Sequence, residues 1–548
     1  MDRAAQTFPI LTPAQVERIA AFGRRRTAPA GELLYDVGDQ STRFYVVLTG
    51  AIEVVQPAGS VEKPIVVHGP GQFTGEINML SARRSLVRAR TTAPSDLLVL
   101  EREDLRRLVQ RDSELSELLM RAFILRRLVL LDVGADDVVL VGSRHSADTM
   151  RIREFLSRNG QPFTYEDVET DKGVQALLDR FEVGVNDVPI VICHGGHVLK
   201  NPPIEKLASL TGLDPELDAA TVRDVVIIGA GPAGLAAAVY GASEGLNVLV
   251  LESSAPGGQA GSSSRIENYL GFPTGISGQA LAGRALTQAE KFGAEVAIGR
   301  TALRIDCDSR PYRVHLSDGQ EVRTRAIVLA PGVKYRKLAL PSLPRFEGAG
   351  VFYSATRLEG QLCAGEEIAI VGGGNSAGQA AVYLSSVARR VNVLVRGPGL
   401  AESMSRYLIQ RIEAIPNIDL RTRCQVVALE GRERLEQVTW AHSGTGKQET
   451  RDIGSLFLMT GADPNTGWLK GCVLMDDKGF IKTGLELMPD DLAAAKWRLA
   501  RRPFLLESSI PGVFCVGDAR SNSVKRVAAA VGEGATCIQL MHSALEAL

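Results

Sequence analysis

The spacing of hydrophobic and polar positions changes along this chain, and each change marks a different type of structure. Between residues 31 and 100, short apolar runs alternate with turns that contain glycine or proline. This pattern predicts a small all-β barrel or jelly roll. From about residue 135, apolar strand-length runs alternate instead with helix-length stretches, which predicts parallel sheets covered by helices. The chain is therefore predicted to be a multidomain α/β protein that begins with a β domain.

Composition and charge narrow the possible settings of the protein. Hydrophobic residues make up 45% of the chain and charged residues 23%, as is ordinary for globular domains. The formal net charge of -1 gives no support for a nucleic-acid partner. No signal peptide or apolar run of about 18 residues occurs, so we expect a cytoplasmic protein without a membrane segment.

The seven cysteines are scattered along the chain, and no two of them have the spacing C-x-x-C. This distribution argues against a disulfide framework and against a zinc site, and it fits a reducing compartment. We therefore expect no metal site.

A strand, a glycine-rich turn and a helix follow one another near residue 225. The apolar run 225–228 leads directly into Gly-Ala-Gly-Pro-Ala-Gly at 229–234, and the next strand ends at Glu252. In such a unit the first glycine permits a tight turn, the second lets the backbone approach a pyrophosphate, and the third lets helix and strand pack closely. The helix N-terminus attracts the phosphates, and the terminal acid binds ribose hydroxyls. The unit predicts a dinucleotide site.

A second unit of this kind begins at the apolar run 368–371. It continues through Gly-Gly-Gly-Asn-Ser-Ala at 372–377, and its next strand ends at Arg396. A cation at this position suits the 2′-phosphate of NADPH, whereas an acid favours NAD. The alternative is a solvated arginine beside a site that accepts either nucleotide. The predicted NADPH residues are Gly372, Gly374, Asn375, Ser376, Ala377 and Arg396.

Further motifs across residues 221–548 resemble the low-molecular-weight thioredoxin reductase family. They include Gly-Gly-Gln at 257–259, Glu-Asn-Tyr at 267–269 and the closing Gly-Val-Phe…Gly-Asp motif at 512–518. The resemblance implies an FAD domain in two parts, 221–337 and 461–548, with an NADPH domain at 338–460 inserted between them. We also expect a homodimer. The FAD residues that it implies are Gly229, Gly231, Pro232, Ala233, Gly234, Glu252, Gly258, Gln259, Asn268, Gly517, Asp518, Arg526 and Val527.

Two places depart from the family pattern in ways that bear on the flavin. Arg526 would place a cation at the pyrimidine end of the flavin, or it turns to solvent. An insertion at about 485–503 could cover the flavin or pack on the surface.

The catalytic dithiol of the family is missing from this chain. Where the family has Cys-Ala-Thr-Cys, this chain reads Ser354-Ala355-Thr356-Arg357. A serine hydroxyl forms neither a thiolate nor a mixed disulfide, so reduction of a thioredoxin through an internal dithiol is disabled. The nearby Cys363 is single and is expected to be structural. No catalytic residue is assigned.

Residues 135–215 resemble a glutaredoxin or thioredoxin-like fold, with Pro189 as its cis-proline. Its redox C-x-x-C would open the first helix, but that place reads Ser146-Ala147-Asp148-Thr149. Because both dithiol positions are lost together, we expect this domain to be a spacer, a dock or a peptide-binding platform.

Residues 1–130 resemble the cyclic-nucleotide-binding family through the segment 37–50 and a phosphate-binding cassette. The resemblance implies that Glu76 accepts the ribose 2′-hydroxyl, that Arg83 pairs with the cyclic phosphate of cAMP or cGMP, and that amides around Gly75 donate further hydrogen bonds. Arg84 stands where a small residue is usual. The alternative is a degenerate cassette that mediates only dimerisation. No helix-turn-helix follows.

Together these patterns predict an FAD-dependent NADPH oxidoreductase of the thioredoxin reductase type, regulated by a cyclic nucleotide. Reduced flavin is expected to pass electrons directly to an unknown acceptor: a small molecule, oxygen, a quinone or a redox protein. Two alternatives remain open: a signalling module without turnover, and a thioredoxin-disulfide reductase that uses cysteines of a partner protein.

Overall fold

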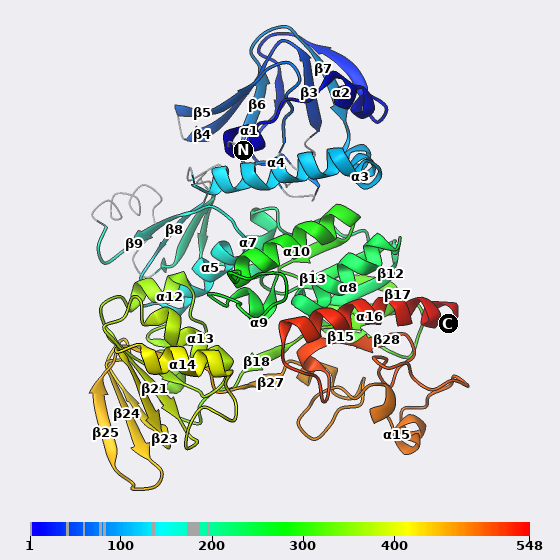
Figure 1. Ribbon diagram of the computed structural model, residues 1–548. Coiled ribbons are helices and arrows are strands. Elements are labelled where there is room, and N and C mark those ends of the chain that lie inside the picture. The colour runs from blue at the N-terminus through cyan, green and yellow to red at the C-terminus, as the bar shows by residue number, and fades with distance from the viewer. Residues whose placement is uncertain are drawn as a thin grey trace.

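The computed structural model describes residues 3–39, 43–58, 61–75, 79–80, 84–132, 138–171, 187–193 and 197–547. The N-terminal β domain lies at one end of the molecule, and a long helix separates it from the remaining parts (Figure 1). Within the described ranges, no helix is long and apolar enough to cross a bilayer.

The N-terminal domain consists of two antiparallel sheets, with strand orders β1-β7-β3 and β2-β6-β4-β5. Its apolar interior includes the rings of Phe44, Phe73 and Phe123, which contact one another. The elements are α1 (Arg3–Thr7), α2 (Pro13–Ala20), β1 (Arg24–Ala28), β2 (Leu33–Tyr35), β3 (Phe44–Thr49), β4 (Ile52–Ala58), β5 (Val61–His68), β6 (Arg88–Thr91), β7 (Ser95–Leu100), α3 (Arg102–Arg111) and α4 (Ser113–Asp132). The predicted β domain is confirmed.

The β domain is followed by two helices, α3 and α4, because the chain breaks at Asp112. The Asp112 carboxylate accepts a hydrogen bond of 3.0 Å from the amide of Leu115 and so caps the start of α4. It also pairs with Arg18 of α2 at 2.9 Å.

The next part of the chain forms a four-stranded sheet of order β11-β10-β8-β9, in which only β8 and β9 are parallel. The bond between Val188 and Pro189, just before β10, is cis. The elements are β8 (Val139–Gly142), α5 (Ala147–Arg158), β9 (Thr164–Asp167), β10 (Ile190–Cys193), β11 (His197–Lys200) and α7 (Ile204–Leu210).

The largest sheet belongs to what we call the first lobe, and its order is β14-β13-β12-β17-β16-β15 with β28 also paired to β17. Strands β12, β13, β14, β17 and β28 are parallel, as the alternation of strand and helix predicts. The elements are β12 (Val222–Ile228), α8 (Pro232–Ser243), β13 (Val248–Glu252), α9 (Gly258–Gly261), α10 (Gly278–Phe292), β14 (Glu295–Ile298), β15 (Ala302–Asp306), β16 (Tyr312–Leu316), β17 (Glu321–Leu329), η4 (Gly467–Leu469), η5 (Gly484–Glu486), α15 (Pro489–Ala494), β28 (Val513–Cys515), η6 (Gly517–Ala519) and α16 (Val527–Glu546).

A second lobe is inserted between two parts of the first. Strands β18 and β27 pair antiparallel where the chain leaves the first lobe and returns to it (Figure 1). The lobe contains a parallel sheet of order β19-β26-β20-β21-β22 and an antiparallel sheet of order β23-β24-β25. The elements are β18 (Val333–Tyr335), α11 (Leu343–Phe346), β19 (Val351–Phe352), α12 (Arg357–Leu362), β20 (Glu367–Val371), α13 (Asn375–Leu384), β21 (Arg390–Val395), α14 (Arg406–Ala414), β22 (Ile418–Thr422), β23 (Cys424–Glu430), β24 (Gln437–His442), β25 (Gln448–Asp452), β26 (Ser455–Leu458) and β27 (Ala462–Pro464).

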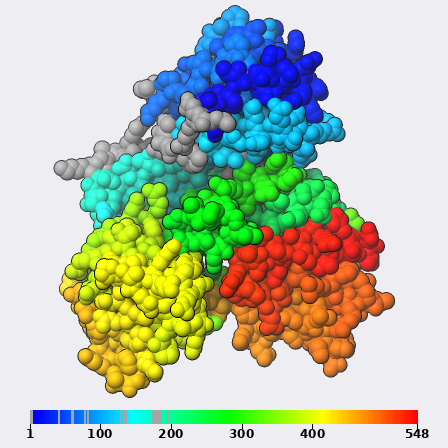
Figure 2. Space-filling view, viewed as in Figure 1, coloured from blue at the N-terminus to red at the C-terminus, as the bar shows by residue number. Residues whose placement is uncertain are grey.

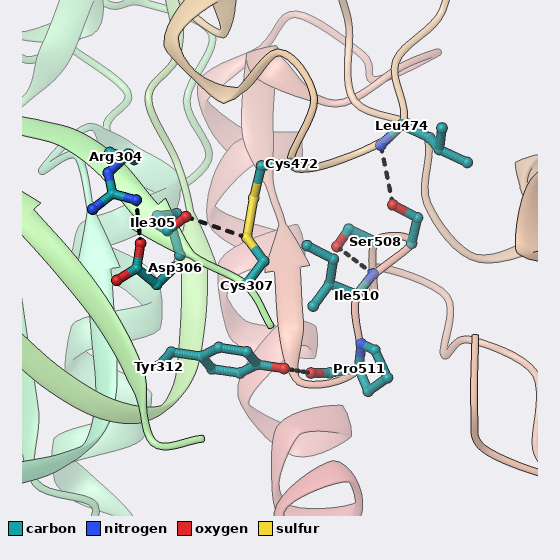
Figure 3. Close-up of a disulfide and its surroundings, with 11 residues drawn as sticks. Arg304, Ile305, Asp306, Cys307, Tyr312, Cys472, Leu474, Ser508, Ile510 and Pro511 are labelled. Carbon is teal, nitrogen blue, oxygen red and sulfur yellow. Dashed lines mark hydrogen bonds and ion pairs between the residues drawn. A yellow bond between two sulfur atoms is a disulfide. The ribbon is translucent and has the colours of Figure 1, made fainter. Parts of the chain in front are cut away.

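The expectation that the cysteines form no disulfide is wrong for one pair. Cys307 follows β15, Cys472 follows η4, and a disulfide joins them although 165 residues separate them in sequence (Figure 3). The inserted lobe accounts for this separation, because the chain returns beside β15 only after completing it. The other five cysteines are buried and belong to no disulfide among the described residues.

The insertion at 485–503 packs on the surface of the first lobe. The guanidinium of Arg501 pairs with the buried carboxylate of Glu507 at 2.6 Å, and the indole of Trp497 donates to the carbonyl of Arg501 at 2.7 Å. No residue of this insertion lines the cavity between the lobes, so it does not form part of the site below.

Candidate functional site

A cavity of about 520 Å³ lies between the two lobes. It is lined by residues of both glycine-rich turns, including Gly231 of the first lobe and Asn375 of the second. Figure 2 shows the boundary between the second lobe, in yellow, and the C-terminal part of the first lobe, in red, as a recess in the surface. The fold therefore brings two motifs that lie far apart in sequence to one cavity.

The first glycine-rich turn joins β12 to α8 and has no room for side chains at two of its glycines. A Cβ at Gly229 would lie 2.2 Å from the carbonyl oxygen of Ala330, and one at Gly234 would lie 1.9 Å from that of Gly229. Gly231 differs, because a Cβ there would have no neighbouring atom closer than 4.0 Å. The backbone at Gly231 thus faces open cavity, into which the amides at the N-terminus of α8 are directed.

Glu252 at the end of β13 is buried and lines the same cavity. Its carboxylate accepts hydrogen bonds from the amide of Ala230 at 2.8 Å and from that of Ser254 at 2.9 Å. The acid therefore fixes the glycine-rich turn, and its remaining lone pairs are available to a ligand.

The segment around α9 completes this side of the cavity. Gly258, Gln259 and Asn268 all line it. The side-chain amide of Gln259 donates to the carbonyl oxygen of Val333 at 2.6 Å, which holds α9 against the connection to the second lobe. A Cβ at Gly258 would lie 3.2 Å from the Cα of Gly231, so the two backbones meet closely.

The C-terminal motif supplies the floor of the cavity. The amide of Gly517 donates to Glu533 at 2.7 Å, and burial raises the pKa of the neighbouring Asp518 carboxyl. Helix α16 begins at Val527, and the side chain of Arg526 makes no capping hydrogen bond. Asp518, Arg526 and Val527 line the cavity, although Arg526 is largely exposed to solvent.

The second glycine-rich turn joins β20 to α13. A Cβ at Gly372 would lie 2.4 Å from the carbonyl oxygen of Met459. Asn375 and Ser376 line the cavity, and the side-chain oxygen of Asn375 accepts a hydrogen bond of 2.7 Å from the amide of Ser405. Four further residues of the predicted site do not line it: Gly372, Gly374, Ala377 and Arg396. Arg396 is exposed at the end of β21.

The segment 354–357 lies between the two turns. Ser354 and Ala355 line the cavity, whereas Arg357 is exposed at the start of α12. Ser354 and Thr356 both hydrogen-bond the carboxylate of Glu359, from Ser354 Oγ at 3.1 Å and from the amide of Thr356 at 2.7 Å. Burial raises the pKa of Glu359. The described residues that line the cavity include no cysteine.

Sequence reasoning missed Glu359, which organises this segment. The signal was present, because Thr356 followed three residues later by Glu359 is the pattern of a helix capping box. It also missed Tyr335 and Trp468, which line the cavity but belong to no motif.

The family of the chain follows from a model that matches residues 223–534, more than half of its length. The chain belongs to the pyridine nucleotide-disulphide oxidoreductase family. A second model, the cyclic nucleotide-binding domain, matches residues 25–112. Membership of the first family supports an enzyme of the NADPH-dependent flavin oxidoreductase type and implies FAD and NADPH as its cofactors.

Relatives within the family have the length of the two lobes. The thioredoxin reductase of Bacillus subtilis is 30% identical over 328 residues, which are 60% of this chain and 96% of that protein. That of Streptomyces clavuligerus is 33% identical over 57% of this chain and 91% of that protein. A crystal structure of Lactococcus lactis thioredoxin reductase is 29% identical, covers 60% of this chain and all of that chain, and has a TM-score of 0.53.

A second, smaller cavity of about 50 Å³ lies in the N-terminal domain. It is lined by Gly75, His68 and Arg126 together with apolar side chains. Arg126 is buried and donates to the carbonyl oxygens of Phe73 at 3.0 Å and Gly75 at 2.8 Å.

The predicted cassette residues are only partly described. Arg84 does not line this cavity; its side chain lies against Gly212, where a Cβ would be 2.4 Å from Arg84 Cγ. The predicted contacts Glu76 and Arg83 lie outside the described residues.

Proposed function

We propose that this chain is an NADPH-dependent flavin oxidoreductase that delivers reducing equivalents without a thiol relay, under the control of a cyclic nucleotide. The observation that carries the proposal is the cavity that residues of both glycine-rich turns line together with Ser354 and Ala355. When bound, the two cofactors supply hydride transfer from a nicotinamide to a flavin. The protein needs only to hold them close and to exclude competing reactions.

The residues of the first lobe fit FAD. The open cradle at Gly231 leaves room for a pyrophosphate to approach the backbone, and the N-termini of α8 and α16 offer amides to anionic groups. Glu252 has free lone pairs for ribose hydroxyls. Asp518 is a hydrogen-bond partner for the ribityl chain, and Arg526 offers a cation to the flavin.

The residues of the second lobe fit a nicotinamide dinucleotide. The start of α13 carries Asn375 and Ser376 into the cavity and would hold the pyrophosphate. Arg396 directly follows the neighbouring strand β21, at a place where a guanidinium can pair with a 2′-phosphate. This placement supports NADPH as the reductant.

The environment of the cysteine thiols supports electron transfer from the flavin without a thiol relay. The cysteine nearest in sequence to the segment 354–357 is Cys363, which is buried, and burial raises the pKa of its thiol to about 11. A thiol with this pKa is not a nucleophile near neutral pH. Ser354 and Thr356 instead hold Glu359, so the segment serves as a helix cap.

Anaerobic titration of the purified protein with NADPH tests the proposal. We expect the visible absorbance of the oxidised flavin to bleach, and the reduced protein to be reoxidised by quinone or oxygen but not by thioredoxin. If NADPH does not bleach the flavin, the enzyme hypothesis is excluded and the hypothesis of a signalling module without turnover remains. Turnover with thioredoxin would favour the use of partner cysteines.

Control by a cyclic nucleotide is supported by contacts between the N-terminal domain and the rest of the chain. Arg127 of α4 donates to the carbonyl oxygen of Gly160 at 2.7 Å, and Arg84 lies against Gly212. Gln110 of α3 donates to two carbonyl oxygens at the end of α10, both at 3.4 Å. A ligand that shifts α4 would therefore act on residues that lead into the first lobe.

A further inference from the structure

Helix α5 contacts both lobes along one of its faces. Its first residue, Ala147, lies so close to Gly348 of the second lobe that a Cβ at Gly348 would be 2.7 Å from Ala147 Cα. One turn later, Met150 is buried in the same apolar cluster as Phe352 and Ala355. Figure 1 shows α5 between α12 of the second lobe and α9 of the first.

The middle of the helix continues along the second lobe. Burial lowers the pKa of Arg153, and the carboxylate of Glu359 is among the charges that oppose this shift. Glu359 is the buried acid that Ser354 and Thr356 hold, so Arg153 lies in the field of the acid that organises the segment 354–357.

The end of the helix is fixed to the first lobe by side chains that donate to backbone carbonyl oxygens. Arg158 donates to Gly258 at 2.8 Å, and Asn159 donates to Ser254 at 3.0 Å. In return, Gln279 of α10 donates to the carbonyl oxygen of Ser157 at 2.7 Å. Gly258 lines the cavity, so α5 ends directly behind the candidate site.

The residues 147, 150, 153 and 157–158 recur every three or four positions, which is the spacing of a single helix face. Because one rigid helix face contacts both lobes, all of these contacts can form together only when the two lobes have one particular relative orientation. In that orientation the cavity is lined by both glycine-rich turns.

We propose that the part of the chain containing α5 is a built-in docking partner of the two lobes, which fixes their relative orientation and occupies the surface beside the segment 354–357. A separate protein cannot then reach this surface. The consequence for the electron acceptor, that it is a small molecule entering the cavity, rests on the proposed function. The docking itself does not.

A matched pair of glycine variants tests the docking. Gly348→Ala adds a methyl group against Ala147, whereas Gly365→Ala adds one where no atom lies within 4 Å, and the two glycines have φ values of 75° and 76°. The backbone cost of alanine is therefore alike, and only the contact differs. We expect amide hydrogen exchange across residues 147–158 to be at least tenfold faster in Gly348→Ala than in Gly365→Ala. Equal exchange in the two variants would overturn the docking.

A cross-link tests whether the observed orientation is the working one. In the Ala147→Cys/Glu347→Cys double variant Gly348 stays glycine and the two new thiols lie on neighbouring stretches of backbone. A short bifunctional methanethiosulfonate should therefore join them through disulfide bonds, visible as a mobility shift on a non-reducing gel and reversed by a reductant. We expect the cross-linked protein to retain its flavin and its rate of flavin reduction by NADPH within about twofold.

Two outcomes separate this inference from the proposed function. A rate that falls tenfold on cross-linking, and recovers on reduction while the single Ala147→Cys variant does not change, would show that the lobes must rotate and would overturn the inference. If NADPH fails to bleach the uncross-linked wild-type flavin, the proposed function fails, and the hydrogen-exchange comparison still decides the docking.

Discussion

At the scale of single residues, the candidate site depends on a few side chains whose environments differ sharply. Glu252 is buried with two backbone amide partners, while Arg396 is exposed at the end of its strand. The sequence predicted both from their positions at the ends of β13 and β21. It did not predict Glu359, because a buried acid within a short helix cap belongs to no nucleotide motif.

Arg396 can be tested by its removal. We expect Arg396→Ala to raise the KM for NADPH roughly 10- to 100-fold, because a charge-assisted hydrogen bond to a phosphate contributes about 1.5–3 kcal/mol. The KM for NADH should change little. Steady-state kinetics with both nucleotides provide the measurement, and Arg389→Ala, at the opposite end of the same strand, is the control. Equal effects on both nucleotides would contradict the assignment.

The buried His68 should make the free energy of unfolding depend on pH. Burial lowers its pKa from 6.5 to about 3, so the folded domain holds the neutral imidazole. Because the folded pKa lies below the unfolded one, the stabilisation is complete above pH 6.5 and is lost as the pH falls towards about 3. Each pH unit in this window costs about 1.4 kcal/mol.

Calorimetry of the wild type and of His68→Gln at a series of pH values from about 7 down to about 4 measures this dependence, because this range begins above the ordinary histidine pKa and extends below it. We expect the variant to lose less stability on acidification. The exposed His197→Gln should behave as the wild type. Parallel curves for the wild type and His68→Gln would exclude this role for His68.

At the scale of elements, the glycine-rich turns show why pattern reasoning succeeded. Gly229 and Gly234 have no space for a side chain, and their spacing is visible in the sequence. By contrast, the break between α3 and α4 depends on the cap at Asp112 and on its pairing with Arg18. A long helical pattern does not reveal a contact of this kind.

The turn before α8 offers a direct test of cofactor binding. Gly231→Ala places a methyl group in the open cradle, and we expect FAD to dissociate at least tenfold more readily, as measured by ultrafiltration of the flavin. Gly283→Ala in α10, which has open space, should retain FAD and should gain about 0.5–1 kcal/mol of helix stability. Equal retention of FAD in the two variants would place the cofactor elsewhere.

At the scale of the whole molecule, the sequence predicted which folds are present better than how they meet. The β domain and the two lobes each have local patterns, and the family model and topology bear them out. The contacts of α5 with both lobes join residues that lie far apart in sequence, such as Arg158 and Gly258, which are 100 positions apart. Neither residue carries a signal of the other, so this arrangement required the structure.

The contact between α4 and the following part predicts how a cyclic nucleotide acts. We expect saturating cAMP or cGMP to change the rate of flavin reduction in the wild type, and we expect this effect to fall at least threefold in Arg127→Ala, which loses the hydrogen bond to Gly160. Arg121→Ala is the control, because Arg121 lies on the same helix and its ion pair is with Glu117 of that helix. Stopped-flow measurements with and without nucleotide decide the matter. An unchanged response would mean that the coupling runs elsewhere.

The bond between Cys307 and Cys472 gives the backbone an unusual connectivity. It closes the stretch that contains the entire second lobe into a covalent ring. A protease that nicks an exposed turn of that lobe would therefore leave one molecule, and the two fragments would separate only after a reductant opens the ring. In oxidising surroundings the nicked chain would therefore stay joined, whereas in reducing surroundings its fragments could separate.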